Sequence, residues 1–129
     1  MPTNLTVKKN DGTTDIVYTA KSGANGTTPA IWQAPGGSAQ QHQPELRVSA
    51  RDTAKGNSRN VRSTYRYPQV ATNSTTGVTT VVNVASARTE WDFPKSMSQS
   101  DINEFVSQYA YLLVTNLIRD AAKTGFAPV

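Results

Sequence analysis

The sequence contains no cysteine and only one histidine among its 129 residues. The absence of cysteine excludes disulfide bonds, thiolate metal sites and cysteine nucleophiles. No apolar run reaches the roughly 20 residues that a membrane-spanning helix needs. The first ten residues, MPTNLTVKKN, lack the apolar segment of a signal peptide. We therefore expect a protein that is made and used without a cleaved secretion signal.

Apolar residues are also scarce, at 36% of the chain, against about 45–50% for typical globular domains on a slightly different residue set. The length suits a single domain over residues 1–129, because domains commonly hold about 100–150 residues. Two explanations of the low apolar share stay open. The core is thin and leaves one face in water, or a second chain completes it.

The sequence offers little for catalysis. The single histidine, His42, lies in a loop rich in Gln and Gly with only Glu45 nearby, and we expect it to be solvated rather than catalytic or metal-binding. Glu90 and Asp92 share a strand face, and we expect them to balance Arg88 and its neighbours rather than to act as an acid–base pair. The phosphate-binding glycine loop, HExxH and GxSxG are all absent from the sequence. We predict no enzyme, no cofactor and no metal.

Positive charge is concentrated in one fifth of the chain. The net charge is +4, and six of the 13 basic residues lie between Arg47 and Arg66, with Asp52 the only acid among them. Five of the six are arginines, whose guanidinium groups suit phosphate and base edges. A solvated face kept for solubility is one interpretation, and a polyanionic partner is the favoured one.

Short segments of alternating character, separated by turn residues, predict β-strands. Asn10-Asp11-Gly12 is a strong hairpin signal between the first two. The last three predicted strands alternate between apolar and polar side chains, so that they share one polar face. The predicted strands are 4–9, 14–20, 29–34, 45–53, 59–67 and 79–93.

The polar face of the predicted sheet combines guanidinium, hydroxyl and amide groups, which can contact RNA phosphates, base edges and 2′-hydroxyls. Tyr65 and Tyr67 fall on the opposite, apolar side by alternation, so any base stacking here depends on arginine. The patch comprises Arg47, Ser49, Arg51, Asn60, Arg62, Thr64, Arg66, Ser86 and Arg88.

The end of the chain changes to a helical period. Ser98 and Asp101, three residues apart, predict a capped helix start, and apolar residues then recur with helical spacing. The stretch 109–118, YAYLLVTNLI, is apolar on nearly all sides, and a helix of that kind must be buried all round. We expect a break at Thr115-Asn116, a second helix that ends at Gly125, and packing against the sheet and a second subunit.

The order and spacing of these features resemble the coat proteins of single-stranded RNA bacteriophages, the leviviruses. The resemblance runs nearly end to end. It includes the Asn-Asp-Gly hairpin, the ANG segment before Trp32, the alternating basic hairpin and PQVAT (68–72), which opens the loop between the family's sixth and seventh strands. FP (93–94) then leads into SMSQSD and two helices.

The resemblance implies an α+β fold with an N-terminal β-hairpin, a five-stranded antiparallel sheet and two C-terminal helices packed on a dimer partner. It implies homodimers that assemble in the bacterial host cytoplasm into an icosahedral virion shell, usually of the T=3 type. The inner face of the sheet packages genomic RNA, and in many members it also binds an operator hairpin that represses replicase translation. No membrane is involved.

Residue roles carried over from the family concern RNA, dimer and shell. The RNA-facing set is the polar patch above together with Glu90. Ser86 stands where well-studied relatives have a stacking tyrosine and Arg88 where they have Asn or Asp, so any operator hairpin is expected to be read differently. The dimer helices contribute Phe105, Tyr109, Leu112, Leu113, Leu117 and Ile118.

The segment after the basic strand, Thr72 to Gly77, is uncharged and small, and the resemblance implies a capsid assembly loop about two residues shorter than in some relatives. We expect strand pairing to end at Pro68 and the tip to be flexible. The assembly-loop residues are Thr72, Asn73, Ser74, Thr75, Thr76 and Gly77.

Two other classes of function remain as alternatives. A non-viral single-stranded nucleic-acid-binding β-domain, of the OB or cold-shock kind, should carry aromatics on the basic face of its strands, and the predicted polar face of this chain has none. A secreted adhesin or pilus-like module conflicts with the missing signal segment and disulfides.

Overall fold

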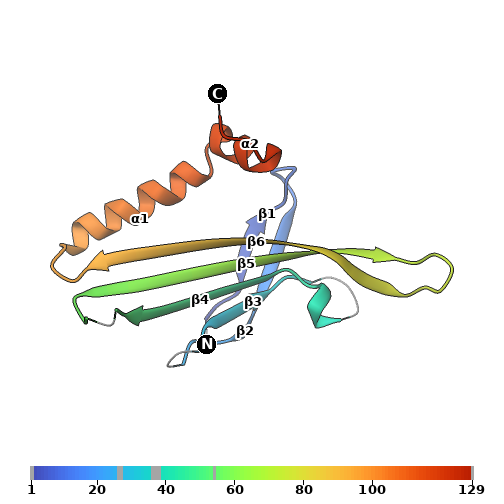
Figure 1. The fold of residues 1–129 in the computed structure, drawn as a ribbon, viewed down its shortest axis with the longest axis horizontal. Helices are drawn as coiled ribbons and strands as arrows, with labels where there is room; N and C mark the ends of the chain where they lie inside the picture. The colour runs from blue at the N-terminus through green and yellow to red at the C-terminus, as the bar shows by residue number, and fades with distance from the viewer. Residues whose placement is uncertain (1, 26–27, 36–38, 54, 129) are drawn as a thin grey trace. The chain divides into compact units, whose positions relative to one another are not determined.

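The computed structural model describes residues 2–25, 28–35, 39–53 and 55–128. Within these ranges the chain forms six strands, a short 3-10 helix and two α-helices (Figure 1). The residues up to Asp92 form one compact unit and those from Phe93 form a second. The elements are β1 Leu5–Lys8, β2 Asp15–Ser22, β3 Ala30–Gln33, η1 Gln40–His42, β4 Glu45–Asp52, β5 Ser58–Thr72, β6 Thr79–Pro94, α1 Gln99–Leu113 and α2 Asn116–Thr124.

The strands form one sheet in the order β1–β2–β3–β4–β5–β6. The predicted hairpin and five-stranded sheet are both present, but they share a strand, so the strands number six and not seven. The first half of β2, Asp15 to Tyr18, pairs with β1, and its second half pairs with β3. The register shifts between Ala20 and Ser22, and such an irregularity bends and twists a strand, which lets β2 serve both. The predicted assembly loop therefore lies between the fifth and sixth strands.

The β1–β2 turn confirms the hairpin predicted from Asn10-Asp11-Gly12. Gly12 has a φ of 75°, a conformation that glycine adopts without steric cost. The carboxylate of Asp11 accepts hydrogen bonds from the backbone N–H of Thr13 at 2.9 Å and of Thr14 at 2.8 Å. These bonds, together with one from the Thr14 hydroxyl, lower the pKa of Asp11 to about 2.

β5 is longer than predicted. Its pairing with β4 ends at Arg66, opposite Glu45, but the strand continues through Pro68 to Thr72 beside β6. A proline lacks the N–H that a second neighbour would require, so it is tolerated where one edge of a strand is unpaired. The expectation that strand pairing ends at Pro68 is therefore wrong, because pairing with β4 ends two residues earlier and the strand itself runs to Thr72.

The turn between β5 and β6 is held by hydrogen bonds within itself. The N–H of Asn73 donates to the carbonyl of Val78 at 2.8 Å, and the N–H of Gly77 donates to the carbonyl of Asn73 at 2.7 Å. The Asn73 side chain accepts from the N–H groups of Thr75 and Thr76. The tip is thus a hydrogen-bonded turn, and its flexibility stays a prediction.

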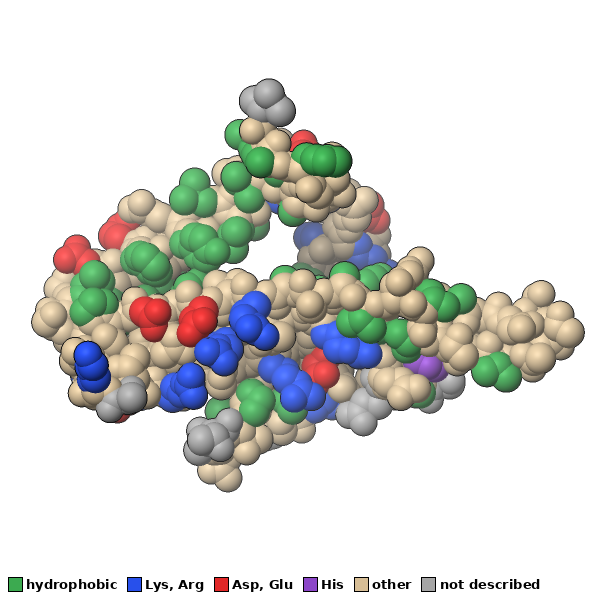
Figure 2. Space-filling model, in the orientation of Figure 1, with side chains coloured by type: hydrophobic (Ala, Val, Ile, Leu, Met, Phe, Trp, Pro, Cys, Tyr) green, Lys and Arg blue, Asp and Glu red, His purple; other side chains and the backbone are tan. Residues whose placement is uncertain are grey.

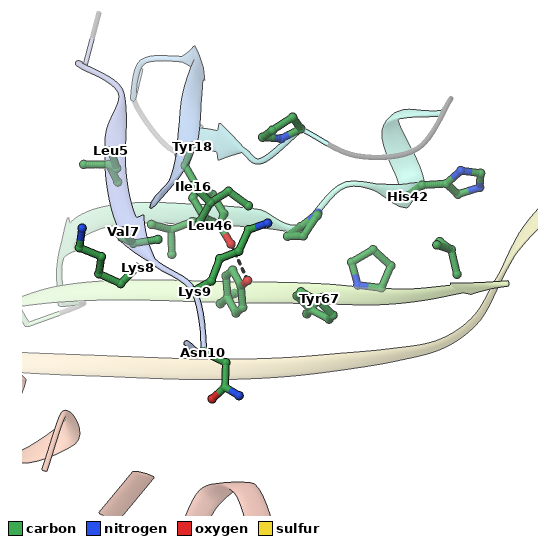
Figure 3. Close-up of a pocket in the computed structure, with 15 residues that line it drawn as sticks. Leu5, Val7, Lys8, Lys9, Asn10, Ile16, Tyr18, His42, Leu46 and Tyr67 are labelled. Carbon is green, nitrogen blue, oxygen red and sulfur yellow. Dashed lines mark hydrogen bonds between the residues drawn. The ribbon is translucent and has the colours of Figure 1, made fainter. Parts of the chain in front are cut away.

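The sheet's apolar face is covered in part by the β1–β2 hairpin. Tyr18 from β2 and Tyr65 from β5 meet there with their hydroxyl oxygens 2.6 Å apart, and burial raises the pKa of Tyr65. A groove of about 790 Å³ remains between hairpin and sheet (Figure 3), with Leu5, Val7, Leu46 and Tyr67 among its apolar lining. The core of the chain alone is thin, because the buried apolar residues among those described are Tyr18, Ala30, Ala34 and Phe93.

His42 does not lie in water as expected. It is the last residue of η1, it lines the same groove, and only 7% of its surface is exposed. A loop rich in Gln and Gly predicts solvent exposure, but the 3-10 turn at Gln40–His42 places His42 in the lining of the groove. Its Nδ1 atom is buried and has no hydrogen-bond partner among the described residues.

The two helices begin and end as predicted. The Ser98 hydroxyl accepts from the N–H of Asp101 at 3.3 Å and caps α1. Thr115 is the N-cap of α2, and Gly125 ends it with a φ of 82°. In the second unit the rings of Phe93 and Phe105 meet edge to face, with centroids 5.8 Å apart. Among the described residues, none of the helices has the length and apolar character to cross a membrane.

Candidate nucleic-acid interface

The polar face is built on β4, β5 and β6. Residues directly opposite in an antiparallel pair lie on the same face, and the register sets Arg47 opposite Thr64, Ser49 opposite Arg62 and Arg51 opposite Asn60. Glu90 on β6 bonds to Asn60 and Arg62, so it shares this face, and alternation along the strand adds Ser86, Arg88 and Asp92. Figure 2 shows basic side chains gathered over these strands, with acidic ones beside them.

The register therefore brings the predicted β4 and β5 sets together as one surface. The polar face, as the name is used below, consists of Glu45, Arg47, Ser49, Arg51, Asn60, Arg62, Thr64, Arg66, Ser86, Arg88, Glu90 and Asp92.

Ion pairs divide the arginines of the polar face into two groups. The Nε atom of Arg47 lies 3.0 Å from Glu45, and an Nη atom of Arg62 lies 3.1 Å from Glu90. Arg66 donates to the backbone carbonyl of Gln41 at 3.1 Å and so keeps its full charge. Arg51 and Arg88 form no hydrogen bond or ion pair with any residue that the structure describes.

The predicted partner of the β6 carboxylates is wrong in its detail. Glu90 accepts from Asn60 at 2.9 Å and from Arg62 at 3.1 Å, and Asp92 accepts from Asn60 at 2.7 Å. Hydrogen bonds from Asn60 and then Arg62 hold the pKa of Glu90 below its ordinary value. Glu90 therefore pairs with Arg62 on the neighbouring strand and not with Arg88 on its own strand, and Asp92 bonds to Asn60.

One of the basic residues that the charge run suggested does not contribute to this face. Arg59 lies opposite Asp52 and pairs with it at 3.0 Å. Alternation along β4 and β5 places both side chains on the side of the sheet opposite the polar face. The polar face thus holds five arginines and three carboxylates, an excess of two positive charges. It remains cationic, but less so than the run between Arg47 and Arg66 suggests.

The apolar residues expected at a dimer interface are exposed in the single chain. Phe105 is 47% exposed, Leu112 58% and Leu117 64%, and no described residue of α1 or α2 is buried. Tyr109, Leu113 and Ile118 are exposed as well. An apolar surface of this extent on both helices is typical of an interaction site.

The groove on the apolar face was not anticipated from the sequence. Leu5 and Val7 alternate along β1, which is the signal that could have placed them opposite Leu46 and Tyr67. Figure 3 shows Leu5 and Val7 on β1 and Tyr67 on β5 among the residues around this space. No group of three or more metal-ligating side chains occurs in the described part of the chain.

Comparisons with known proteins were made at the levels of family, sequence and structure. A family profile described as Levivirus coat protein matches residues 2–126. A search of curated protein sequences finds no match. Among solved structures, similarity is found to a virus-like particle of Beihai levi-like virus 21, with a TM-score of 0.83 and 18% identity over 100% of this chain and 98% of the other.

Two further structures are similar over nearly their whole lengths. A virus-like particle of bacteriophage NT-214 has a TM-score of 0.85 and 13% identity, over 100% of this chain and 99% of the other. The bacteriophage GA protein capsid has a TM-score of 0.79 and 18% identity, over 96% of this chain and 95% of the other. At these identities the similarity shows the fold, which is the α+β arrangement expected from the sequence.

Proposed function

Because the chain belongs to the levivirus coat protein family, we propose that it is the capsid subunit of a single-stranded RNA bacteriophage. In this proposal the protein is structural and not enzymatic, and its place is the virion. Homodimers assemble in the cytoplasm of the bacterial host into an icosahedral shell of the T=3 type, and the polar face holds genomic RNA. Both compact units belong to one coat-protein domain that a second copy completes.

The observation that carries this proposal is the apolar surface that the single chain leaves exposed. Every described residue of α1 and α2 has solvent access, although the sequence of 109–118 is apolar on almost all sides. β6 is the last strand of the sheet, and Val82 and Val84 on it are 51% and 50% exposed. A long unpaired edge strand with apolar side chains is a template for pairing with another chain.

A second copy would cover both features. Pairing of β6 with β6 of the partner continues the sheet across the dimer and satisfies the free edge. The groove between hairpin and sheet, about 790 Å³ in volume and mostly apolar in its lining, would receive apolar side chains from the partner's helices. Burial contributes about 25 cal/mol per Å² of apolar surface, so helices of this exposure favour association strongly.

RNA packaging follows from the charge of the polar face. Arg51, Arg66 and Arg88 have no carboxylate partner among the described residues, and each can neutralise a phosphate with release of counterions. The RNA-facing residues carried over from the family, of which Arg47 is the first and Glu90 the last, lie on the three strands that form this face. An operator hairpin, if one is bound, would be read without an aromatic at position 86.

The turn after β5 would serve as the assembly loop. Residues Thr72 to Gly77 lie at the end of the β5–β6 hairpin, which extends beyond the other strands in Figure 1. Small uncharged side chains neither repel nor clash when several copies meet around a symmetry axis. Their internal hydrogen bonds present one preformed shape to those contacts.

A non-viral single-stranded nucleic-acid-binding domain is the second candidate. It would use the same basic strands but with aromatic side chains for base stacking, and none of the polar-face residues is aromatic. Such a domain would also have no use for two exposed apolar helices.

Electron microscopy of the purified protein after expression in bacteria tests the proposal. Uniform shells that contain host RNA are the expected result. A stable monomer at high concentration, with no shells and no bound nucleic acid, would overturn it.

A further inference from the structure

A cleft lies at the end of the polar face, where β4 and β5 are joined and β6 passes beside them. Its volume is about 450 Å³, and its lining comes from all three strands and the residue that follows β4. The lining residues are Arg51, Asp52, Thr53, Asn60, Glu90 and Asp92.

The hydrogen bonds around Asn60 leave acceptors free in this cleft. Asn60 is 6% exposed, and its Nδ2 group donates to Oε1 of Glu90 and to Oδ1 of Asp92. Arg62 also donates to Oε1 of Glu90. The second oxygens, Oε2 of Glu90 and Oδ2 of Asp92, accept no hydrogen bond from any described residue. The amide of Asn60 thus bonds to both carboxylates, and each carboxylate keeps one oxygen that can accept a hydrogen bond from an occupant of the cleft.

One donor completes the lining. The guanidinium group of Arg51 has no ion-pair partner in the described chain, although its charge acts on Glu90. Arg51 is exposed, so its N–H groups can donate to an acceptor on an occupant of the cleft.

The charges of the cleft restrict what can enter it. The pKa of Glu90 is lowered, chiefly by the hydrogen bond from Asn60, so this carboxylate is ionised at neutral pH and repels phosphate together with Asp92. Arg51 weakens the attraction of the carboxylates for a divalent cation, and the described residues hold no group of three or more metal-ligating side chains. An uncharged group with N–H donors for the carboxylates and a carbonyl for Arg51 fits both restrictions.

We propose that this cleft binds the Watson–Crick edge of an unpaired guanine in the packaged RNA. Guanine carries two neighbouring donors, N1–H and the N2 amine, next to the carbonyl acceptor O6. Adenine and cytosine each offer a single amine on that edge, and uracil offers a single N–H. The proposal rests on RNA binding at the polar face, and it adds a base preference that charge alone would not produce.

Short single-stranded RNAs test this preference on the full-length, unassembled protein isolated by size-exclusion chromatography. The probes are a uridine oligomer and versions with one central guanosine, adenosine, inosine or 1-methylguanosine, measured by fluorescence anisotropy. A good bidentate contact is worth about 1–3 kcal/mol, so the guanosine oligomer should bind about tenfold more tightly than the adenosine one. Inosine lacks the N2 amine and should fall between them, and 1-methylguanosine should bind no better than adenosine.

Two substitutions in the cleft and one outside it separate base recognition from charge. Asp92→Asn and Glu90→Gln keep an oxygen that can accept from Asn60, but they place an N–H donor against the donors of guanine. Each should abolish the guanosine preference, so that the guanosine and adenosine oligomers bind the variant with equal affinity. Glu104→Gln, the same change on α1, should retain the preference. Circular dichroism of each variant verifies that it folds.

The outcomes of the test are distinct. Binding of all oligomers with equal affinity would overturn the guanine site and leave RNA binding intact. A dependence on Mg²⁺ without base preference would also overturn it, in favour of a cation site. Failure to bind any oligomer, by a protein that also forms shells free of RNA, would instead refute RNA binding at the polar face.

Discussion

Salt dependence of RNA binding should distinguish the two groups of arginines on the polar face. Arg66 and Arg88 have no carboxylate partner in the part of the chain that the structure describes, whereas Arg47 and Arg62 lie 3.0 and 3.1 Å from Glu45 and Glu90. Only a cation that is not already neutralised brings a full charge to a phosphate. We therefore expect the double variant Arg66→Ala/Arg88→Ala to lose more of the salt dependence than Arg47→Ala/Arg62→Ala, although both remove two charges.

The size of the effect follows from counterion release. Each phosphate contact on a single strand contributes about 0.7 to the slope of log K against log salt. Loss of two contacts lowers the slope by about 1.4, so the affinity lost between about 50 and 200 mM salt shrinks by roughly sevenfold. The Arg47→Ala/Arg62→Ala variant should change the slope by clearly less than the value of about 0.7 that one phosphate contact contributes.

The assay is fluorescence anisotropy of a labelled uridine oligomer, titrated at several salt concentrations with the wild-type protein and both double variants. A uridine probe keeps the guanine preference out of the comparison. Equal changes of slope in the two variants would show that ion pairing within the chain does not decide which arginines contact phosphate. An unchanged slope in both would place the RNA elsewhere.

Other predictions concern the dimer, the hairpin and the assembly loop. Leu117→Asp puts a charge into the exposed apolar surface of α2 and should give monomers by light scattering, whereas Asn116→Asp, the adjacent position at the helix start, should still form dimers. The pKa of Asp11 is lowered from 3.8 to about 2, so its hydrogen bonds stabilise the hairpin above about pH 4, and this stabilisation is lost as the pH falls through 2. In an NMR titration the chemical shift of the Thr14 amide should change with a midpoint near pH 2. Asp11→Asn should abolish this transition. Gly77 has a φ of 74° with open space around it, so Gly77→Ala should lower the free energy of unfolding by about 1–2 kcal/mol in thermal melts, and an equal Tm to wild type would contradict the strain.

Much of the fold could be predicted because its signals are local. The Asn-Asp-Gly turn, the Ser98 cap, the break at Thr115 and the end at Gly125 each depend on residues within one turn of chain. The alternation along 45–53 and 59–67 placed each side chain on the correct face, because a strand turns successive side chains to opposite sides whatever its neighbours are.

Features that depend on distant neighbours were missed or only partly correct. β2 is a single strand shared by the hairpin and the larger sheet, because its two halves pair with different partners. His42 is buried because η1 lies beside the groove, which no property of its own loop indicates. The strand after Pro68 continues because β6 pairs with it on one edge while β4 has already ended.

The sequence by itself determined a cationic, aromatic-free face on an antiparallel sheet and two helices too apolar to stand alone. Tertiary structure decided which of those charges are available, because ion pairing depends on the cross-strand register, which brings Arg62 to Glu90 and gives Arg88 no ion-pair partner among the described residues. It also decided that Asn60 donates to one oxygen of Glu90 and one oxygen of Asp92 in a cleft, where their second oxygens can accept further hydrogen bonds. Periodicity sets the face on which a side chain lies, but only the packed strands set the groups that it meets there.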